Sequence, residues 1–252
     1  MDRNFYIEYY DLERKHWWFR VREKIILDHV KLFFGNKLCS GNPITILNVG
    51  VASGRSSEAL GALGVVTSIE YDSDCCEFTR SKTGLEIING TILDLPFEDN
   101  KFDMVCSFDV VEHVENDVLA IAEMKRVCKN DGVVFITVPA FKILWSHHDI
   151  VNHHYRRYRM SEIDKLFNHP KDKVIARTYY NSLLFVPIFL VRIISHLLPN
   201  IFVRDSAGSD FTLLDQDSVV NKFSYFIFAL ERRLLKYVKF PFGVSIIYAI
   251  KK

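Results

Sequence analysis

The stretch WSHHDIVNHHYRRY at residues 145–158 holds four of the nine histidines of the chain within eight positions. An aspartate, two arginines and two tyrosines belong to the same stretch. Histidine beside a carboxylate can act as a base, histidine and aspartate can bind a metal, and arginines among aromatic residues can contact nucleic acid. Which chemistry applies depends on the elements that position these side chains.

A metal centre and a nucleic-acid contact are the weaker interpretations of this stretch. Zinc needs three or four converging ligands, which His148, Asp149 and His153 or His154 contain. Adjacent histidines point in different directions, however, and neither an HExxH motif nor a cysteine ligand accompanies them. A magnesium ion shared with a diol substrate is the more sensible metal alternative. The RRYR segment is short and the formal net charge is +1, so we predict no bound metal and no nucleic-acid partner.

A second feature that can do chemistry is LNVGVASGRSSEAL at residues 47–60, where an apolar run leads through a glycine loop into a short helix. Glycines let a backbone approach a ligand closely, and a helix N-terminus favours negative charge. Glu70 lies 20 residues beyond Gly50, at the end of the next apolar run. A carboxylate at that place can accept both hydroxyls of a ribose, which predicts a nucleoside-bearing cofactor.

Two alternatives for this loop remain. A tight strand–helix turn without any ligand is one of them. The other is a nicotinamide-binding loop, whose fingerprint is GxGxxG. Counting from Gly50, the second and third glycines of that fingerprint are Ala52 and Arg55 here. An arginine would crowd the packing of the helix on the strand, so the spacing disfavours a dinucleotide.

The elements around these motifs alternate between strands and helices. Helices are predicted at 5–34, 56–64, 73–83 and 115–130, where apolar residues recur at helical spacing and glycines end two of the segments. This alternation predicts an α/β fold with a doubly wound, seven-stranded, mostly parallel sheet. The strands are expected at 44–50, 65–70, 85–88, 102–111, 133–139, 173–178 and 244–252.

A single domain of residues 1–252 fits the length of the chain. Within it we expect an N-terminal helical segment (1–40), a cofactor-binding core (44–180), an apolar helical insertion (181–240) and the last strand (241–252). The most apolar region, 178–203, contains Pro187 and Arg192 and is too short on either side of the arginine to span a bilayer. Buried helices or peripheral membrane contact are its two interpretations.

The composition indicates a reducing compartment. The five cysteines form no CxxC pair and their number is odd, so free thiols are the simplest account. No continuous apolar core of a signal peptide occurs near Met1. We therefore expect a cytoplasmic protein, with membrane association open.

Taken together, these motifs resemble the class I S-adenosylmethionine-dependent methyltransferases. NVGVASG resembles the family pattern of an acid followed by GxGxG, with Asn48 in place of the acid and Ala52 in place of the middle glycine. Glu70 matches the ribose-binding acid, and NGTILDLPFEDNKFDMV (89–105) resembles the adenine-side loop and the fourth strand. The resemblance covers residues 44–160 and implies S-adenosylmethionine as cofactor and S-adenosylhomocysteine as product.

The resemblance also implies which residues bind the cofactor. The usual acid after Gly90 is Thr91, so backbone groups around Thr91 and Ile92 would bracket the adenine. Asp109 resembles the residue near the methionine end, whereas Glu112 and His113 equally suit a helix-entry pair held by local hydrogen bonds. The implied cofactor contacts are Asn48, Gly50, Ala52, Gly54, Glu70, Tyr71, Thr91, Ile92, Asp109 and His113.

The stretch 145–158 follows the fifth predicted strand and so leaves the same edge of the sheet as the glycine loop. It resembles the pattern PA…LWSxHD…HxRRY of bacterial methyltransferases associated with saccharide, lipid or surface-polymer pathways, and HWWF at 16–19 recurs in that subset. Methyl transfer to a hydroxyl needs a base, for which His148 oriented by Asp149 is the first candidate and His154 the second. His147 and His153 have no predicted role.

Substrate contacts are expected from Trp145, Arg156, Arg157 and Tyr158, with the arginines binding an anionic acceptor. The predicted function is methyl transfer to a hydroxyl of a sugar, a glycolipid or another small polar acceptor, and N-methylation is an alternative. A non-catalytic fold relative, or a membrane-peripheral protein acting through 181–240, is the rival from another class. A homodimer is possible. The structural alternative for the stretch 145–158 is a lid ordered by its own hydrogen bonds and an Arg–Asp pair.

Overall fold

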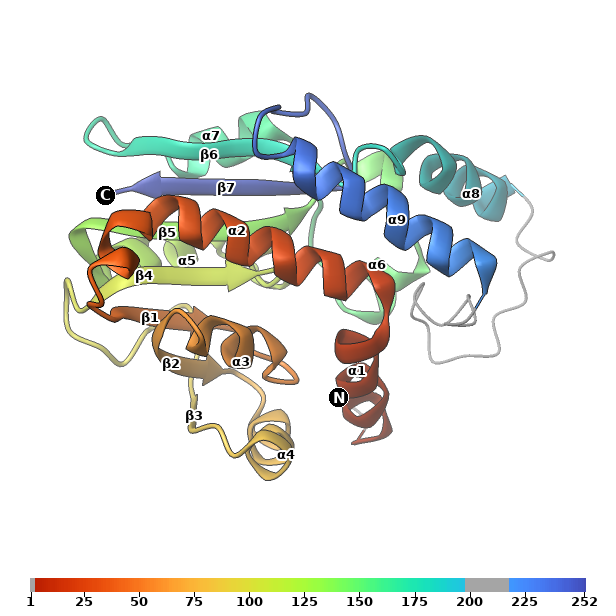
Figure 1. Cartoon of the computed structure of the whole chain (residues 1–252). Coiled ribbons are helices and arrows are strands. Elements are labelled where there is room, and N and C mark those ends of the chain that lie inside the picture. The colour runs from red at the N-terminus through yellow and green to blue at the C-terminus, as the bar shows by residue number, and fades with distance from the viewer. Residues whose placement is uncertain (1–2, 198–217) are drawn as a thin grey trace.

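The computed structural model describes residues 3–197 and 218–252 of the chain. In this part a seven-stranded sheet has the order β3-β2-β1-β4-β5-β7-β6 (Figure 1). All neighbours are parallel except β7, which is antiparallel to both β5 and β6. This confirms the predicted seven-stranded, mostly parallel α/β fold. The strands are β1 (Ile44–Val49), β2 (Gly64–Glu70), β3 (Ile87–Asn89), β4 (Phe102–Phe108), β5 (Cys128–Pro139), β6 (Lys173–Tyr180) and β7 (Ser245–Lys251).

Helices cover both faces of the sheet, with α2 and α9 in front and α5 and α7 behind in Figure 1. The α-helices are α1 (Arg3–Lys15), α2 (Trp17–Cys39), α3 (Arg55–Gly61), α4 (Ser73–Thr83), α5 (Asp117–Val127), α6 (His147–Val151), α7 (Met160–Leu166), α8 (Phe185–Leu197) and α9 (Val219–Leu234). Two short 3-10 helices, η1 (Val111–His113) and η2 (Lys142–Leu144), follow β4 and β5.

Alternation along the strands divides the core into two layers. In β1, Leu47 belongs to the cluster on the α5 and α7 side, whereas Ile46 belongs to the cluster on the α2 and α9 side. Met124 of α5 and Phe228 of α9 are fully buried members of these two clusters. Burying one such side chain stabilises the fold by roughly 1.5–3 kcal/mol. Both sheet faces therefore hold the strand ends, and the loops after them, in fixed positions.

The N-terminal helix predicted at 5–34 is two helices that meet at His16. The backbone of His16 is extended (φ −70°, ψ 138°), and its buried imidazole accepts a hydrogen bond from the backbone N–H of Trp18 at 3.3 Å. His16 is therefore the N-cap of α2, and α1 can turn away from α2 toward the edge of the sheet.

The helix predicted at 115–130 ends earlier than expected, because Cys128 already pairs with Phe102 of β4. The Asp131-Gly132 pair, which directly follows the predicted helix, lies within β5, where Asp131 has a left-handed backbone (φ 65°). A side chain at Gly132 would lie 2.7 Å from the Cys128 sulfur, so the close packing of this turn requires glycine.

The apolar insertion predicted at 181–240 contributes α8 and α9, which lie between β6 and β7 in the chain. Residues 198–217, within this insertion and partly within the apolar region 178–203, lie outside the described residues. Helix α9 packs along α2. None of the helices described is long and apolar enough to cross a membrane. The division of the chain into a core and an insertion stays a prediction.

Candidate active site

The parallel strands β1, β2, β4 and β5 end on one edge of the sheet, and the loops after them carry the predicted site residues (Figure 1). Ligands of open α/β sheets bind outside the carboxyl ends of the strands, where the strand order reverses. Here β1 is followed along the chain by β2 on one side, and β4 lies on its other side. The glycine loop after β1 is thus at the topological switch point.

The glycine loop has the tight backbone that its sequence predicts. Gly50 and Gly54 have φ angles of +73° and +80°. A Cβ at Gly50 would lie 2.4 Å from the side chain of Val110, and one at Gly54 would lie 2.8 Å from that of Thr79. Ala52 also has a positive φ (44°), at the position where the resembling pattern has glycine. Its Cβ makes this conformation cost about 1 kcal/mol more than it would for glycine.

Glu70 lies at the mouth of this loop. Its carboxylate accepts the backbone N–H of Ala52 at 3.0 Å and the N–H groups of Tyr71 and Asp72 at 2.8 and 3.2 Å. These bonds fix a carboxylate between the glycine loop and the end of β2, the place that suits the hydroxyls of a ribose. The side chain of Tyr71 is 79% exposed beside it. The arrangement fits a nucleoside cofactor.

Asn48, predicted to contact the cofactor, lies beneath the loop instead. It is buried in β1, donates to the hydroxyls of Ser56 and Ser57 at 2.8 and 2.9 Å, and accepts a weak bond from the Cys106 thiol. Its position in the strand directs the side chain to the α3 side of the sheet. Asn48 therefore positions the start of α3, and a cofactor contact by its side chain stays a prediction.

The predicted adenine-side residues offer backbone groups only. The side chain of Ile92 is buried in the core, and the hydroxyl of Thr91 accepts the backbone N–H of Leu93 at 3.2 Å. This agrees with the expectation that backbone groups at these two positions bracket the adenine ring. The contact itself stays a prediction.

Asp109, after β4, is paired with a residue that the sequence did not single out. The guanidinium of Arg22 in α2 lies 2.5 Å from its carboxylate, and the Thr137 hydroxyl donates to it at 3.2 Å. Burial alone lowers the pKa of Arg22, but the charge of Asp109 more than offsets it and keeps the guanidinium charged. No local motif marks Arg22, because its role depends on how α2 packs across the sheet.

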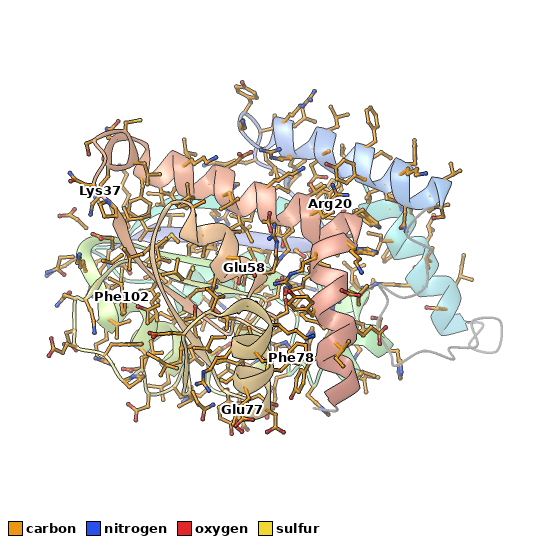
Figure 2. The ribbon with its side chains drawn as sticks, turned by 60° about the horizontal axis from the view of Figure 1, so that its bottom comes forward. Arg20, Lys37, Glu58, Glu77, Phe78 and Phe102 are labelled. Atoms are coloured by element: carbon orange, nitrogen blue, oxygen red, sulfur yellow. The ribbon has the colours of Figure 1, made fainter. Side chains whose placement is uncertain are left out.

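Helix α1 covers the glycine loop, a role that the sequence did not predict. Arg14 donates to the hydroxyl of Ser53 at 3.1 Å and to Glu58 at 2.9 Å, and the Tyr6 hydroxyl donates to Asp72 at 2.9 Å. Phe78 of α4 packs against rings from α1 (Figure 2). The Glu13 carboxylate accepts a bond from Ser53, and burial raises its pKa. The cofactor edge is therefore closed on one side by α1.

Asp149 holds the stretch 145–158 together. It is fully buried, and its carboxylate accepts the Arg157 Nε–H at 2.7 Å, the His154 ring at 2.8 Å and the backbone N–H of Ser146 at 2.7 Å. Burial raises the pKa of this carboxyl, but the bonds from His154 and Arg157 outweigh it, so the pKa lies well below its ordinary value. Asp149 is therefore ionised at neutral pH.

The expected partnership of Asp149 with His148 is not formed. Successive residues of α6 point about 100° apart, so Asp149 faces the interior while His148 faces Asn152, whose amide lies 3.2 Å from its ring. His154 takes the place beside Asp149 because the chain turns back after α6. Sequence adjacency predicted the wrong histidine partner. His147 and His153 are exposed.

The arginines and the tyrosine expected to bind substrate are engaged within the protein. Arg157 is buried between Asp149 and the carbonyl of Ala140, and Arg156 donates to Asp117 at 2.7 Å and to the carbonyl of Glu115 at 2.7 Å. The Tyr158 hydroxyl also donates to Asp117, at 2.9 Å. These contacts fix the stretch above α5. Trp145 is partly buried, and its substrate role stays a prediction.

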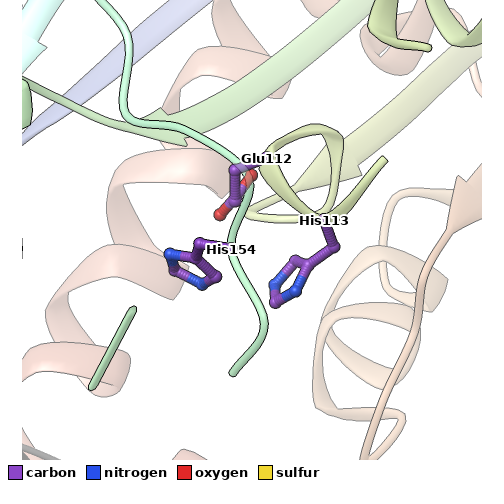
Figure 3. A group of neighbouring side chains, drawn as sticks. All are labelled: Glu112, His113 and His154. Atoms are coloured by element: carbon purple, nitrogen blue, oxygen red, sulfur yellow. The ribbon is translucent and has the colours of Figure 1, made fainter. Parts of the chain in front are cut away.

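Three side chains converge beside Asp149: Glu112 and His113 from η1, and His154 (Figure 3). One ligand atom of each lies within 4.8 Å of the others, so they could hold a metal ion. The Glu112 carboxyl is fully buried, and neither oxygen has a hydrogen-bond partner among the described residues. Burial and the charge of Asp109 raise its pKa well above the ordinary value.

The two histidines of this group meet edge to face, with 4.4 Å between ring centroids. Burial, together with the neighbouring His154, lowers the pKa of His113 to about 4, so its ring is neutral at physiological pH. Because the ionised Asp149 can only accept a hydrogen bond, His154 Nδ1 carries a proton and donates it to that carboxylate. The arrangement can take a proton from a group at the sheet edge.

Comparison with known proteins agrees with this geometry. Residues 47–136 match the family described as "Methyltransferase domain". Over 127 residues the chain is 31% identical to the demethylmenaquinone methyltransferase of Staphylococcus aureus (strain MRSA252). The alignment covers 46% of this chain and 50% of that protein, so the chain spans about half the length of the curated relatives it matches.

Solved structures show the same fold at low identity. A provisionally named sarcosine dimethylglycine methyltransferase from Galdieria sulphuraria has a TM-score of 0.57 at 14% identity, over 90% of this chain and 86% of that chain. A provisionally named methyltransferase from Bacillus halodurans C-125 has a TM-score of 0.55 at 15% identity, over 83% and 93%. Residues 47–136 thus match a methyltransferase domain, and the described part of the chain shares the fold of these solved methyltransferases; S-adenosylmethionine is the cofactor that this match indicates.

Proposed function

We propose that the protein transfers a methyl group from S-adenosylmethionine to a hydroxyl of a sugar, a glycolipid or another small polar acceptor. The observation that carries this proposal is the Asp149–His154 pair at the sheet edge that also carries the glycine loop and Glu70. A proton acceptor beside a methyl-donor site suits a nucleophile that must lose a proton, as a hydroxyl must.

The residues at this edge fit the cofactor. The loop from Gly50 to Gly54 would hold it by its backbone, Glu70 would accept the ribose hydroxyls, and Asp109 lies where the methionine end is expected. When bound, S-adenosylmethionine supplies a methyl group on a positively charged sulfur. The closed packing of α1 on the loop would keep water away from that group.

His154 is the proposed base. With S-adenosylmethionine bound, an acceptor hydroxyl that takes its methyl group would give up its proton to His154 Nε2. The carboxylate of Asp149 then stabilises the imidazolium, and Arg157 and Ser146 keep that carboxylate in place. Holding donor and acceptor in line supplies most of the acceleration.

Two measurements test this function. Calorimetry with S-adenosylmethionine and S-adenosylhomocysteine should show binding of both, and a Glu70→Ala variant should bind much more weakly. If the unaltered protein binds neither compound, the proposed methyltransferase activity is ruled out. Methyl-labelled S-adenosylmethionine, incubated with the protein and a cell extract, should then label an acceptor whose new methyl group mass spectrometry places on oxygen. A label on nitrogen would replace O-methylation by N-methylation.

A demethylated menaquinone is the second candidate acceptor, because the relative at 31% identity is a demethylmenaquinone methyltransferase. Adding demethylmenaquinone to the acceptors tested separates this candidate from a sugar hydroxyl. The cytoplasmic location and the lack of a nucleic-acid partner stay predictions.

A further inference from the structure

One face of α9 is apolar and exposed along its length. Val219, Phe223, Phe226, Leu230 and Leu234 recur every three or four residues and are 82%, 62%, 65%, 43% and 37% exposed; we call these five residues the α9 stripe. The opposite face of the helix, with Phe228 and Glu231, is buried. The packing of α9 on α2 accounts for the buried face, which also holds Asn221 and Ser224, but not for the exposed α9 stripe.

The charges that α9 itself carries away from its buried face are all cationic, and Asp28 of α2 pairs with one of them, Arg232. Glu231 is the only acidic residue between 218 and 252, and it is fully buried, where it accepts the backbone N–H groups of Ser182 and Leu183 at 2.7 and 2.8 Å. Helical spacing places Lys222 and Arg233, both exposed, along one flank of the stripe. An apolar stripe beside cations is the pattern of helices that lie in the interface of an anionic bilayer.

We propose that the α9 stripe docks on an anionic lipid surface. Phe223 and Phe226 would enter the acyl boundary, and Lys222 and Arg233 would contact lipid phosphates. Tyr237, 87% exposed just after the helix, suits the same depth because an aromatic ring with a polar hydroxyl favours the membrane interface. A second copy of the chain fits less well, because antiparallel pairing of two α9 helices would set the cations of one copy against those of the other.

This docking goes beyond the proposed methyl transfer and does not depend on it. It does connect to the candidate site, since Glu231 of α9 anchors the segment leading into α8, and Arg192 of α8 lies 4.0 Å from the Asp149 carboxylate. Docking through α9 would thus bring the acceptor side of the site near the bilayer, where a lipid-linked acceptor resides.

Sedimentation with vesicles tests the docking without any activity measurement. The full chain should co-sediment with vesicles of phosphatidylcholine and phosphatidylglycerol, and far less with phosphatidylcholine alone. The double variant F223S/F226S should bind the anionic vesicles at least roughly tenfold more weakly, because two aromatic side chains no longer enter the bilayer. Lys222→Glu with Arg233→Glu should weaken binding to the anionic vesicles and lower its dependence on salt.

A matched control is V118S, since Val118 is 63% exposed on α5, on the other face of the sheet. It should bind vesicles like the unaltered chain, and all variants should keep the circular dichroism spectrum and S-adenosylmethionine binding of the parent. Equal binding to both kinds of vesicle, or binding that F223S/F226S leaves unchanged, would overturn the proposal. So would a dimer in light scattering that F223S/F226S dissolves, because it would assign the stripe to a second copy.

Discussion

Single residues decide which histidine can act as the base. His154 is held by an ionised, buried Asp149, whereas His148 lies against the Asn152 amide. We predict that His154→Ala lowers kcat by about a hundredfold or more, the contribution expected of a positioned base, with S-adenosylmethionine affinity unchanged. His148→Ala should lower it much less, and His147→Ala, at an exposed position, not at all. Steady-state kinetics and calorimetry check this; a larger loss in the His148 variant would reverse the assignment.

The prediction that turnover needs no metal can be tested at the group of Glu112, His113 and His154. Its ligand atoms lie close enough to hold an ion, but the raised pKa of Glu112 makes a neutral carboxyl, which is a poor ligand until its proton leaves. We predict that turnover is the same with and without a chelator and that no divalent ion restores or raises it. Loss of turnover with the chelator, recovered by one ion and absent in His113→Ala, would instead assign a metal to this group.

Elements were predictable from the sequence where local patterns decide them, and contacts between distant elements were not. Apolar runs indicated all seven strands, although β5 begins at Cys128 and not at the predicted residue 133, and the spacing of Gly50, Gly54 and Glu70 placed the loop at the correct edge. The division of the N-terminal helix at His16 was not predicted, because the His16 imidazole caps α2 through a local hydrogen bond that the spacing of apolar residues does not indicate. The pairing of Arg22 with Asp109 depends on tertiary packing alone.

The glycine loop carries a strain that one substitution can relieve. Ala52 has a φ of 44°, and its N–H still reaches Glu70. We predict that Ala52→Gly leaves that bond intact and raises the free energy of unfolding by up to about 1 kcal/mol, because glycine adopts positive φ without a Cβ clash. Ala62→Gly is the control: Ala62 has a right-handed backbone (φ −70°), so glycine there should destabilise. Denaturant titration of both variants distinguishes this strain from a general effect of glycine.

At the scale of the whole molecule, Asp103 of β4 joins one helix and two neighbouring strands of the sheet. Its carboxylate accepts Lys37 Nζ from the end of α2 at 2.7 Å, the backbone N–H of Thr45 in β1 at 2.9 Å, and lies 3.2 Å from Lys129 Nζ of β5. Burial raises the pKa of this carboxyl, but the bonds from Lys37 and Thr45 outweigh it, so the folded-state pKa lies well below its ordinary value. The carboxylate therefore stabilises the fold wherever it is ionised.

The sign of the pH dependence follows from that direction. Because the folded-state pKa of Asp103 lies below the unfolded value of about 3.9, its contribution is fully present above that pH and is lost as the pH falls toward the folded-state pKa. We predict that Asp103→Asn lowers the free energy of unfolding by about 2 kcal/mol at neutral pH, the size expected of hydrogen bonds to a charged group. The difference from the parent chain should shrink below about pH 4.

Asp131→Asn is the matched control. Asp131 pairs with Lys251 at the surface and its side chain is 85% exposed, so this change should alter stability little at any pH. A difference for Asp103→Asn that stays constant down to acid pH in denaturant titrations would show that the carboxylate charge does not hold α2 to these strands.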